Sequence, residues 1–449
     1  MSAKVPHSNR VRPVAGSTVP AQMLRRAIAA SLVASVLEWF DFIIYGMFAV
    51  VIGRLFFPTE SAAASLLLSF ATFGVGFAMR PLGGVLLGLY GDRVGRNKAL
   101  ALTVTLMAAG TACMAVLPGY AAIGVAAPVL MVLARIVQGF SAGGAFASGT
   151  TILIEFAPAN RRGLYGSLQA VAAAAAIAGG ALAAWLITAN LTPAALDAWG
   201  WRVPFLIGVL SGPIGWYIHA RVDDSPEFRA WLQARRATAP ATVGASLGEL
   251  FRRYPRELVS TMGVVIVNTV ALYIVLFFIP AFAEQHFGLA GAGVTLSTFI
   301  ASLITLAVCP LSGWLSDVYG RKAVFLTGVV FSVCAAWFLY RHFLAAPSFT
   351  TLLAAQTGVA FFLGVTWGPQ STAVTEAFPV GVRSTGAAIA YNVAVLLFGG
   401  LAPLLNTWLV KATGNVMVPV YYVLIAAVIG FVGAAWLPRI CGRSVVQAA

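Results

Sequence analysis

The chain has 449 residues, of which 60% are hydrophobic and only 9% are charged. A soluble globular domain carries about a quarter charged residues, so this composition excludes that class and indicates an integral membrane protein. The formal net charge of +14 does not indicate nucleic-acid binding. The basic residues lie in short loops between long apolar segments, which is typical of membrane proteins.

Twelve segments are long and apolar enough to be spanning helices, which need about 20 residues each. They cover residues 27–53, 62–90, 98–117, 124–154, 164–189, 202–220, 257–283, 292–315, 322–344, 350–376, 384–410 and 416–437. The longest polar stretch divides them into six and six. The predicted organisation is a disordered tail (1–26), a six-helix bundle (27–220), a central loop (221–256), a second bundle (257–437) and a second tail (438–449).

The apolar run after Arg26 continues to about Phe57, which is too long for a cleaved signal peptide. Lysine and arginine set the predicted orientation, because cytoplasmic loops are enriched in both. With both termini cytoplasmic, 22 of the 28 basic residues fall on the cytoplasmic side. The four on the opposite side are Arg54, Arg202, Arg341 and Lys411.

Two loop motifs occur twice, about half the chain apart. The pattern G-x-x-x-D-x-x-G-R comprises Gly88, Asp92, Gly95 and Arg96, and 225 residues later Gly313, Asp317, Gly320 and Arg321. The pattern E-x-x-P-x-x-x-R comprises Glu155, Pro158 and Arg162, and 221 residues later Glu376, Pro379 and Arg383. Such a duplication indicates parallel repeats, as in transporters whose substrate site lies between two halves near the bilayer midplane.

The charged residues of these motifs are predicted to gate the molecule. The glycine permits close helix packing, and the aspartate can pair with an arginine or with the N-terminus of a neighbouring helix. Such a clasp holds one conformation shut, whereas the alternative is a static turn. The predicted gating residues are Asp92, Arg96, Asp317, Arg321, Glu155, Arg162, Glu376 and Arg383.

Four ionisable residues fall well inside the predicted spans, all in the first half: Glu38, Asp41, Arg80 and Arg135. Charges at that depth are costly and usually work in a cavity. Glu38 and Asp41 are three residues apart and share a helix face. Arg80 precedes Asp92 by 12 residues, about 18 Å along a helix, which places it near mid-depth. The alternative is a salt-bridge network that only ties helices together.

Asp41 is predicted to carry a coupling proton, with Glu38 as its modulator. Removal from water and a neighbouring carboxylate both favour the protonated form, while a nearby arginine opposes it. Arg135 can then alternate between a carboxylate of the protein and an anionic substrate, because its planar fork binds carboxylates bidentately.

The second half has only uncharged polar groups in its interior. They are Asn268, Tyr273, Gln356, Trp367, Gln370, Tyr391, Asn392 and Asn406. Tyr273 and Asn392 lie mid-span and are the best candidates to orient a substrate, although each can instead form an interhelical hydrogen bond. The predicted substrate-binding set is Arg135, Gln138, Arg80, Tyr273 and Asn392. Pro280, Pro310, Pro369 and Pro403 mark expected kinks.

The chain resembles the major facilitator superfamily, and within it the metabolite:proton symporters. The matching stretches are LEWFDFIIYG (37–46), RPLGGVLLGLYGDRVGR (80–96), RIVQGFSAGG (135–144), WGWRVPF (199–205), 313–322 and 391–414. The resemblance implies twelve helices in two bundles, alternating access, and uptake of a small organic solute with protons. Known relatives carry citrate, other di- and tricarboxylates, shikimate, or proline and betaine. In this family an acidic residue commonly follows the double glycine, whereas Ala145 follows Gly144 here.

The expected function is proton symport of a small anionic metabolite, a di- or tricarboxylate such as citrate, across a bacterial inner membrane. One alternative is a zwitterionic osmolyte such as proline or betaine, and a second is a proton-driven drug exporter. The partners are the substrate, protons and the lipid bilayer, with no nucleic acid, and we expect a monomer. No metal site, cofactor or enzyme activity is expected, since no His cluster, P-loop or nucleophile–base motif is found.

Overall fold

A computed structural model describes residues 21–437, except 211, 214–215, 217–247, 249, 290 and 380–381. The predicted tails are therefore outside the described residues for 1–20 and 438–449, and the predicted central loop for 221–247. Several side chains within described helices are outside the description as well, among them those of Asp92, Arg96, Ala145 and Glu155.

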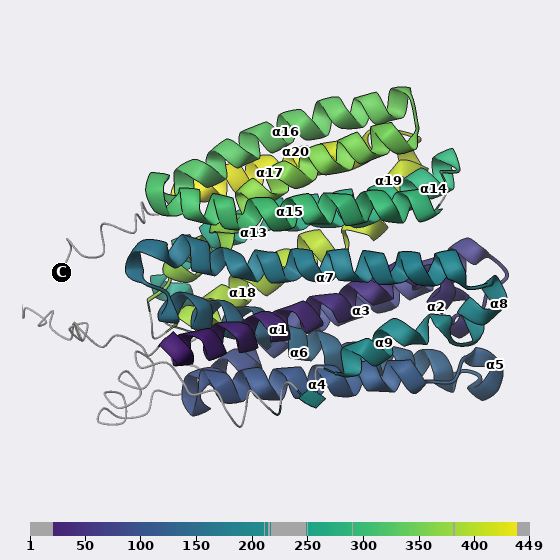
Figure 1. Cartoon of the computed structure of the whole chain (residues 1–449), viewed down its shortest axis with the longest axis horizontal. Coiled ribbons are helices and arrows are strands. Elements are labelled where there is room, and N and C mark those ends of the chain that lie inside the picture. Colours follow the sequence, from purple (N-terminus) through teal and green to yellow (C-terminus); the bar gives the residue numbers. More distant parts are fainter. Residues whose placement is uncertain are drawn as a thin grey trace, which may run out of the picture.

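The molecule is built from two bundles of long helices that lie side by side (Figure 1). The first bundle, purple to teal in Figure 1, is connected by short turns and single-turn helices. It comprises α1 (Ala21–Met47), α2 (Ala49–Phe56), α3 (Ala62–Val94), α4 (Arg96–Val116), α5 (Tyr120–Ile123), α6 (Ala126–Phe156), η1 (Ala159–Arg161), α7 (Arg162–Asn190), α8 (Pro193–Ala195), η2 (Leu196–Gly200) and α9 (Arg202–Val209).

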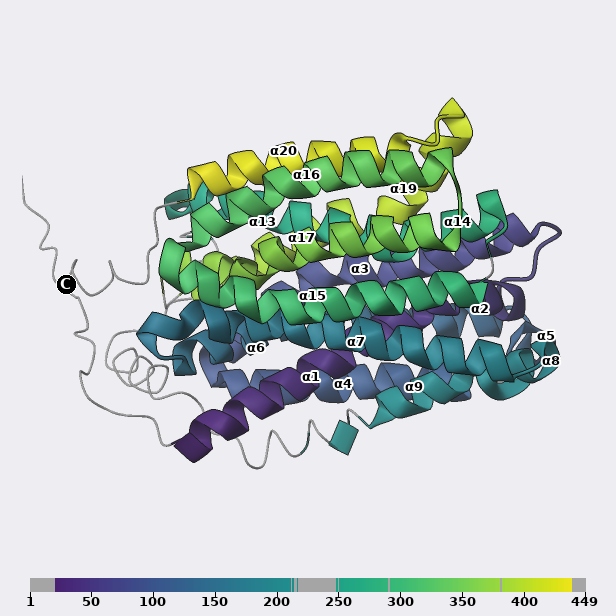
Figure 2. The same cartoon turned by 45° about the horizontal axis from the view of Figure 1, so that its top comes forward.

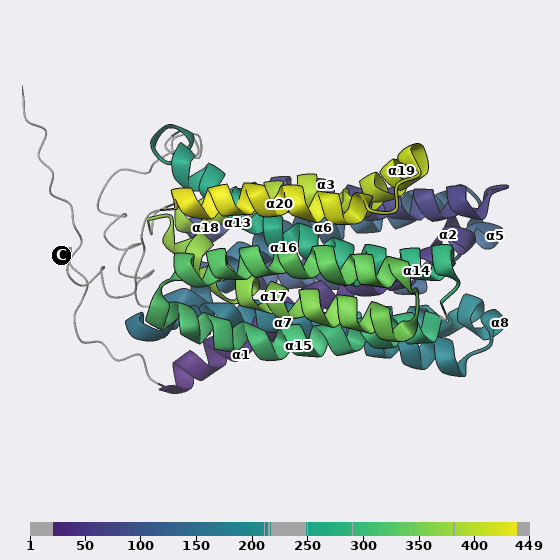
Figure 3. The same cartoon turned by 90° about the horizontal axis from the view of Figure 1, so that it is seen from above.

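The second bundle, green to yellow, repeats this arrangement. It comprises α13 (Pro255–Tyr273), η3 (Ile274–Phe278), α14 (Ile279–Phe287), α15 (Gly291–Tyr319), α16 (Arg321–Ala345), α17 (Phe349–Glu376), α18 (Arg383–Val395), η4 (Leu396–Gly400), α19 (Ala402–Thr413) and α20 (Val418–Trp436). The long helices keep a common direction in all three views (Figures 2 and 3). The end that carries both G-x-x-x-D-x-x-G-R copies, at the left of Figure 1, is called the motif end below.

The helices coincide with the predicted spans. Among the described residues, ten helices are long and apolar enough to cross a membrane, and the pair α1–α2 makes eleven if its two parts form one span. That pair is bent by 65°. The twelfth predicted span, 202–220, begins with α9, and most of its remainder lies outside the described residues.

Three predicted boundaries differ from the structure. Helix α1 begins at Ala21, inside the predicted tail, because residues 21–26 are mostly good helix formers and include neither glycine nor proline. Helix α13 begins at Pro255 and not at 257, since proline suits the first position of a helix. Leu250, placed in the central loop by the sequence, is buried against the second bundle with Leu258 and Phe378.

The four expected proline kinks divide into two kinds. Pro280 and Pro403 follow the π-helical turns η3 and η4, which interrupt the seventh and eleventh spans. Pro310 and Pro369 lie inside α15 and α17, which continue through them. A proline cannot donate a backbone hydrogen bond, and a widened preceding turn is one way to accommodate it.

Glycines allow α3 and α6 to touch backbone to backbone. A Cβ atom added to Gly139 would lie 1.9 Å from the carbonyl oxygen of Gly76, and one added to Gly143 would lie 2.0 Å from that of Arg80. Small residues spaced four apart are the usual means by which membrane helices approach so closely. This contact sets the distance between the polar residues of α3 and those of α6.

Substitution of Gly139 by Ala is therefore expected to destabilise the protein by about 1–3 kcal/mol, because the backbone of α3 must move to admit the methyl group. The measurement is the unfolding midpoint of the purified protein in detergent. Gly74→Ala on α3 is the matched control, since nothing lies within 4 Å of its added Cβ. Equal midpoints for the two variants would contradict this account of the α3–α6 contact.

Candidate functional site

The four interior charges lie in two separate groups within the first bundle. In the first group, Arg80 of α3 donates from Nη2 to Oε1 of Glu38 on α1 at 2.8 Å. Both residues are buried, at 1% and 4% exposure. The Arg80 guanidinium carbon also lies 4.8 Å from the centre of the Phe42 ring and 5.2 Å from that of Phe77. This ion pair is thus enclosed by aromatic rings that favour a cation.

The Arg80–Glu38 pair faces the second bundle. Phe77, beside Arg80, packs its ring edge-on against Tyr273 of α13, with centroids 5.6 Å apart. The rings of Trp39 and Trp367 also meet across the halves at 6.1 Å. Tyr273 interacts electrostatically with Arg80 and Glu38. The pair therefore lies where the two halves meet, which is where transporters built from two repeats bind substrate.

The second group is a chain of hydrogen bonds between Arg135 and Asp41. Arg135 donates from Nη1 to Oε1 of Gln138 at 2.6 Å. Gln138 donates from Nε2 to the Thr111 hydroxyl at 2.7 Å, and that hydroxyl donates to Oδ2 of Asp41. Among the described residues, Arg135 and Asp41 form no direct ion pair. The two residues that the sequence placed in one switch are connected through two uncharged side chains.

Arg135 is a fully buried cation with donors to spare. Its guanidinium carbon lies 3.9 Å from the centre of the Tyr45 ring, 5.0 Å from Phe42 and 5.2 Å from Phe73. Its Nε and Nη2 atoms have no hydrogen-bond partner among the described residues. Buried donors are nearly always paired, so unpaired donors on a buried cation are an arrangement suited to an anionic ligand.

The uncharged candidates of the second half are placed differently from one another. Tyr273 packs between Phe77 of the first bundle and Phe277 of its own. Asn392 of α18 donates to the carbonyl oxygen of Gly143 at 2.8 Å, so its amide nitrogen joins the two halves. Asn268, a weaker candidate, bonds to Gln370 and Thr366 within the second bundle. Of this group, Tyr273 is the one that lies beside the interior charges.

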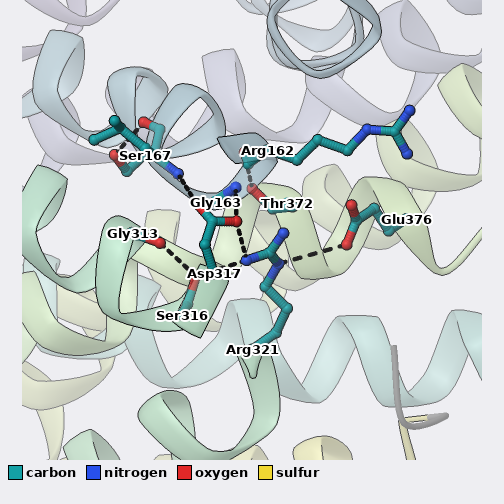
Figure 4. Close-up of polar contacts among 10 residues, drawn as sticks. Arg162, Gly163, Ser167, Gly313, Ser316, Asp317, Arg321, Thr372 and Glu376 are labelled. Atoms are coloured by element: carbon teal, nitrogen blue, oxygen red, sulfur yellow. Dashed lines mark hydrogen bonds and ion pairs between the residues drawn. The ribbon is translucent and has the colours of Figure 1, made fainter. Parts of the chain in front are cut away.

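The motif end is closed by an acid of one half that caps a helix of the other (Figure 4). Asp317 of α15 accepts hydrogen bonds from the backbone amides of Gly163 and Leu164 at 2.8 and 2.9 Å. These amides begin α7, where the helix dipole favours an anion. Arg321 donates to Asp317 at 2.6 Å and lies 3.5 Å from Glu376. We call these five residues the latch.

The other predicted gating residues have separate positions. The carbonyl oxygen of Arg162 accepts a hydrogen bond from Thr372 at 3.0 Å, which adds a second link between the halves. Arg383 donates from Nε to the carbonyl oxygen of Phe378 at 3.3 Å. Asp92, Arg96 and Glu155 have side chains outside the description, so a matching latch in the first repeat stays a prediction.

Thr111 is the residue of this site that sequence reasoning missed. It lies within the third predicted span, where threonines are unremarkable, and no motif or charge singles it out. Its role depends on the approach of α4 to α1, which only the fold shows.

Known proteins resemble this chain over nearly its whole length. Residues 27–243 match the family model for sugar (and other) transporters, and residues 261–442 match that of the Major Facilitator Superfamily. The citrate-proton symporter of Klebsiella pneumoniae is 34% identical, with 95% of this chain and 96% of the relative covered. The chain belongs to the major facilitator superfamily.

Other relatives carry a different name. The proline/betaine transporter of Escherichia coli K12 is 32% identical, with 94% of this chain and 84% of the relative covered. Solved structures share the fold. A proton:xylose symporter bound to 6-bromo-6-deoxy-D-glucose has a TM-score of 0.73 at 17% identity, with 94% of this chain and 98% of that chain covered. A partially occluded inward-open xylose transporter from E. coli has a TM-score of 0.71 at 18% identity, with coverages of 92% and 97%. The predicted all-helical membrane fold of two parallel six-helix halves is confirmed.

In this major facilitator, Asp317→Asn is expected to open the motif end, because the neutral amide loses both the Arg321 pair and the charge attraction of the α7 terminus. The measurement is the labelling rate of a single cysteine placed at Ser167, beside the latch, in a background lacking the native cysteines. A several-fold faster rate is expected, with little change in substrate affinity. Unchanged labelling together with about tenfold weaker equilibrium binding would move Asp317 from the latch to the substrate site.

Proposed function

We propose that this chain is a secondary transporter that takes up a small carboxylate-bearing metabolite together with protons. In this proposal it resides in a bacterial inner membrane with both termini cytoplasmic, so that the motif end faces the cytoplasm. The observation that carries the proposal is Arg135, a buried guanidinium with two nitrogens that no described residue satisfies. The names of the relatives, citrate-proton symporter and proline/betaine transporter, support transport of carboxylate-bearing solutes.

A di- or tricarboxylate such as citrate is the first candidate substrate. Arg135 and Arg80 lie on adjacent helices, α6 and α3, and both guanidinium groups face the Phe42 ring. One substrate carboxylate would bind the free side of Arg135, and a second would compete with Glu38 for Arg80. Guanidinium groups suit this role because each can hold a carboxylate through two parallel hydrogen bonds.

A zwitterionic osmolyte is the second candidate, and a specific observation favours it. The interior holds two acids and two arginines, so its formal charge is balanced before any ligand binds. Aromatic rings from both halves, among them Trp39, Trp367 and Tyr273, surround the same region. Aromatic faces bind quaternary ammonium groups. A betaine would place its carboxylate on Arg135 and its cation among these rings.

The proposed transport cycle couples Asp41 to the opening of the halves. Asp41 takes up a proton, with Glu38 modulating it through the Arg80 pair. The substrate then binds between the halves, and the two bundles rock about it as rigid bodies. The latch holds the motif end shut until substrate and proton are both bound. A ligand shifts this balance only by its different affinity for the two states.

The test is uptake into proteoliposomes that contain the purified full chain. The panel comprises radiolabelled citrate, malate, shikimate, proline and glycine betaine, each with and without an imposed inward proton gradient. Gradient-driven accumulation of citrate or malate is the expected result. Accumulation of glycine betaine or proline alone would select the second candidate, and no gradient-driven accumulation of any of the five would reject the proposed function.

Arg135→Lys is expected to raise the half-saturating substrate concentration by about tenfold or more, because an ammonium group lacks the planar fork. The measurement is initial uptake rate against substrate concentration. Arg341→Lys, at an exposed position outside the site, is the matched control. Wild-type kinetics in Arg135→Lys would remove Arg135 from the substrate site.

Asp41→Asn is expected to abolish gradient-driven accumulation while leaving substrate exchange across the membrane, because exchange does not require release of the proton. Two assays on the same proteoliposomes separate these activities: accumulation under a proton gradient, and counterflow without one. If accumulation persists in Asp41→Asn, the coupling proton is carried elsewhere, and Glu38→Gln becomes the decisive variant.

A further inference from the structure

Thr111 is positioned to answer to the charge of Asp41. Its hydroxyl donates to Oδ2 of Asp41, and it also lies 3.0 Å from the carbonyl oxygen of Met107. It accepts a hydrogen bond from Gln138 at 2.7 Å. A hydroxyl has one hydrogen and two lone pairs, so it can donate to only one of its two acceptors at a time. The same hydroxyl can therefore serve Asp41 either as donor or as acceptor.

No other described side chain forms a hydrogen bond with Asp41. Its Oδ1 atom has no partner among the described residues and points at Gly208 of α9, where an added Cβ would lie 2.0 Å away. The charged groups that act on Asp41 are Arg135 of α6 and Glu38 of its own helix. The other described charges on the helices packed against α1 pair with Glu38 or lie near helix ends: Arg80, and Arg54, Lys98, Arg162 and Arg202.

With Asp41 ionised, every bond of the chain is directed at its carboxylate. Arg135 donates to Gln138, Gln138 donates to Thr111, and Thr111 donates to Asp41. Hydrogen bonds in such a series polarise one another, so the negative charge at one end strengthens the hold on Arg135 at the other.

Protonation of Asp41 reverses the last bond. A proton from the aqueous phase forms an O–H bond at Oδ2, and this new group donates to the Thr111 oxygen. The Thr111 hydrogen turns to the carbonyl oxygen of Met107, so every hydrogen keeps an acceptor and no other covalent bond changes. The chain then ends on a neutral carboxyl group.

We infer that Thr111 is a positioning residue for transport: through Gln138 it relays the protonation of Asp41 to Arg135, whose guanidinium is thereby released to a substrate carboxylate. The inference rests on the proposed function and adds to it the route by which proton and substrate are coupled. Coupling between two binding events is reciprocal, so the apparent substrate affinity must depend on pH through this route.

The transport test compares Thr111→Val, which removes the hydroxyl, with Thr111→Ser, which retains it. In proteoliposomes, with citrate and glycine betaine as probes, the wild-type KM should change by up to tenfold per pH unit where one proton is linked to binding. Thr111→Val should reduce this to less than about threefold, and Thr111→Ser should restore it. Thr105→Val is the matched control, because Thr105 lies on the same helix and donates only to the carbonyl oxygen of Ala101 among the described residues.

A spectroscopic test does not depend on transport. In infrared difference spectra of the purified full chain, the carboxyl C=O band of protonated Asp41 is identified by its loss in Asp41→Asn. The band should shift in Thr111→Val, because its hydrogen-bond partner is gone, and return in Thr111→Ser. In wild type it should also respond to Arg135→Lys, and this response should shrink in a Gln138→Leu background.

The two tests keep this inference separate from the proposed function. Failure of both probes to accumulate would reject the proposed function, while the infrared bands would still report on the relay. An unshifted Asp41 band in Thr111→Val would overturn the inference. So would a Thr111→Val protein that transports either probe with the pH dependence of wild type.

Discussion

The burial of four charges in the interior of one bundle is the constraint on which the rest of this structure depends. An ionised group away from water is costly unless it is paired, hydrogen-bonded or placed against aromatic faces. The first bundle uses all three means: Glu38 pairs with Arg80, Gln138 and Thr111 connect Arg135 to Asp41, and aromatic rings cover both guanidinium groups. The donors and acceptors that remain unsatisfied mark where the site is incomplete without a ligand or a proton.

Close helix packing makes these pairings possible. The glycines of α3 and α6 bring the two backbones into contact, which sets Arg80 and Arg135 on adjacent helices around Phe42. Gly208 does the same for α9 and α1 at Asp41. Because these contacts join backbones directly, the polar groups are held on a rigid frame. The two charge groups can then respond to a proton or a ligand without rearrangement of the bundle.

The two halves have the same architecture but divide the chemistry unequally. The first bundle holds every interior charge, and the second provides aromatic and amide groups that face it, such as Tyr273 and Trp367. The latch connects them at the motif end through the one described acid that caps a helix of the opposite half, Asp317. Substrate chemistry and conformational control are thus located at different depths. A change at the latch can alter the balance of states while leaving the binding groups intact.

The sequence by itself determined the class, the spans and the duplication, because hydropathy and repeated motifs depend on residue type and spacing alone. It also singled out Glu38, Asp41, Arg80 and Arg135, since charge within an apolar span is visible without a structure. Only the tertiary structure decided how these four are paired, that Asn392 joins the halves, and that Thr111 belongs to the site. Which side chains meet depends on the rotation and approach of helices distant in sequence, and an uncharged threonine leaves no signal until its neighbours are known.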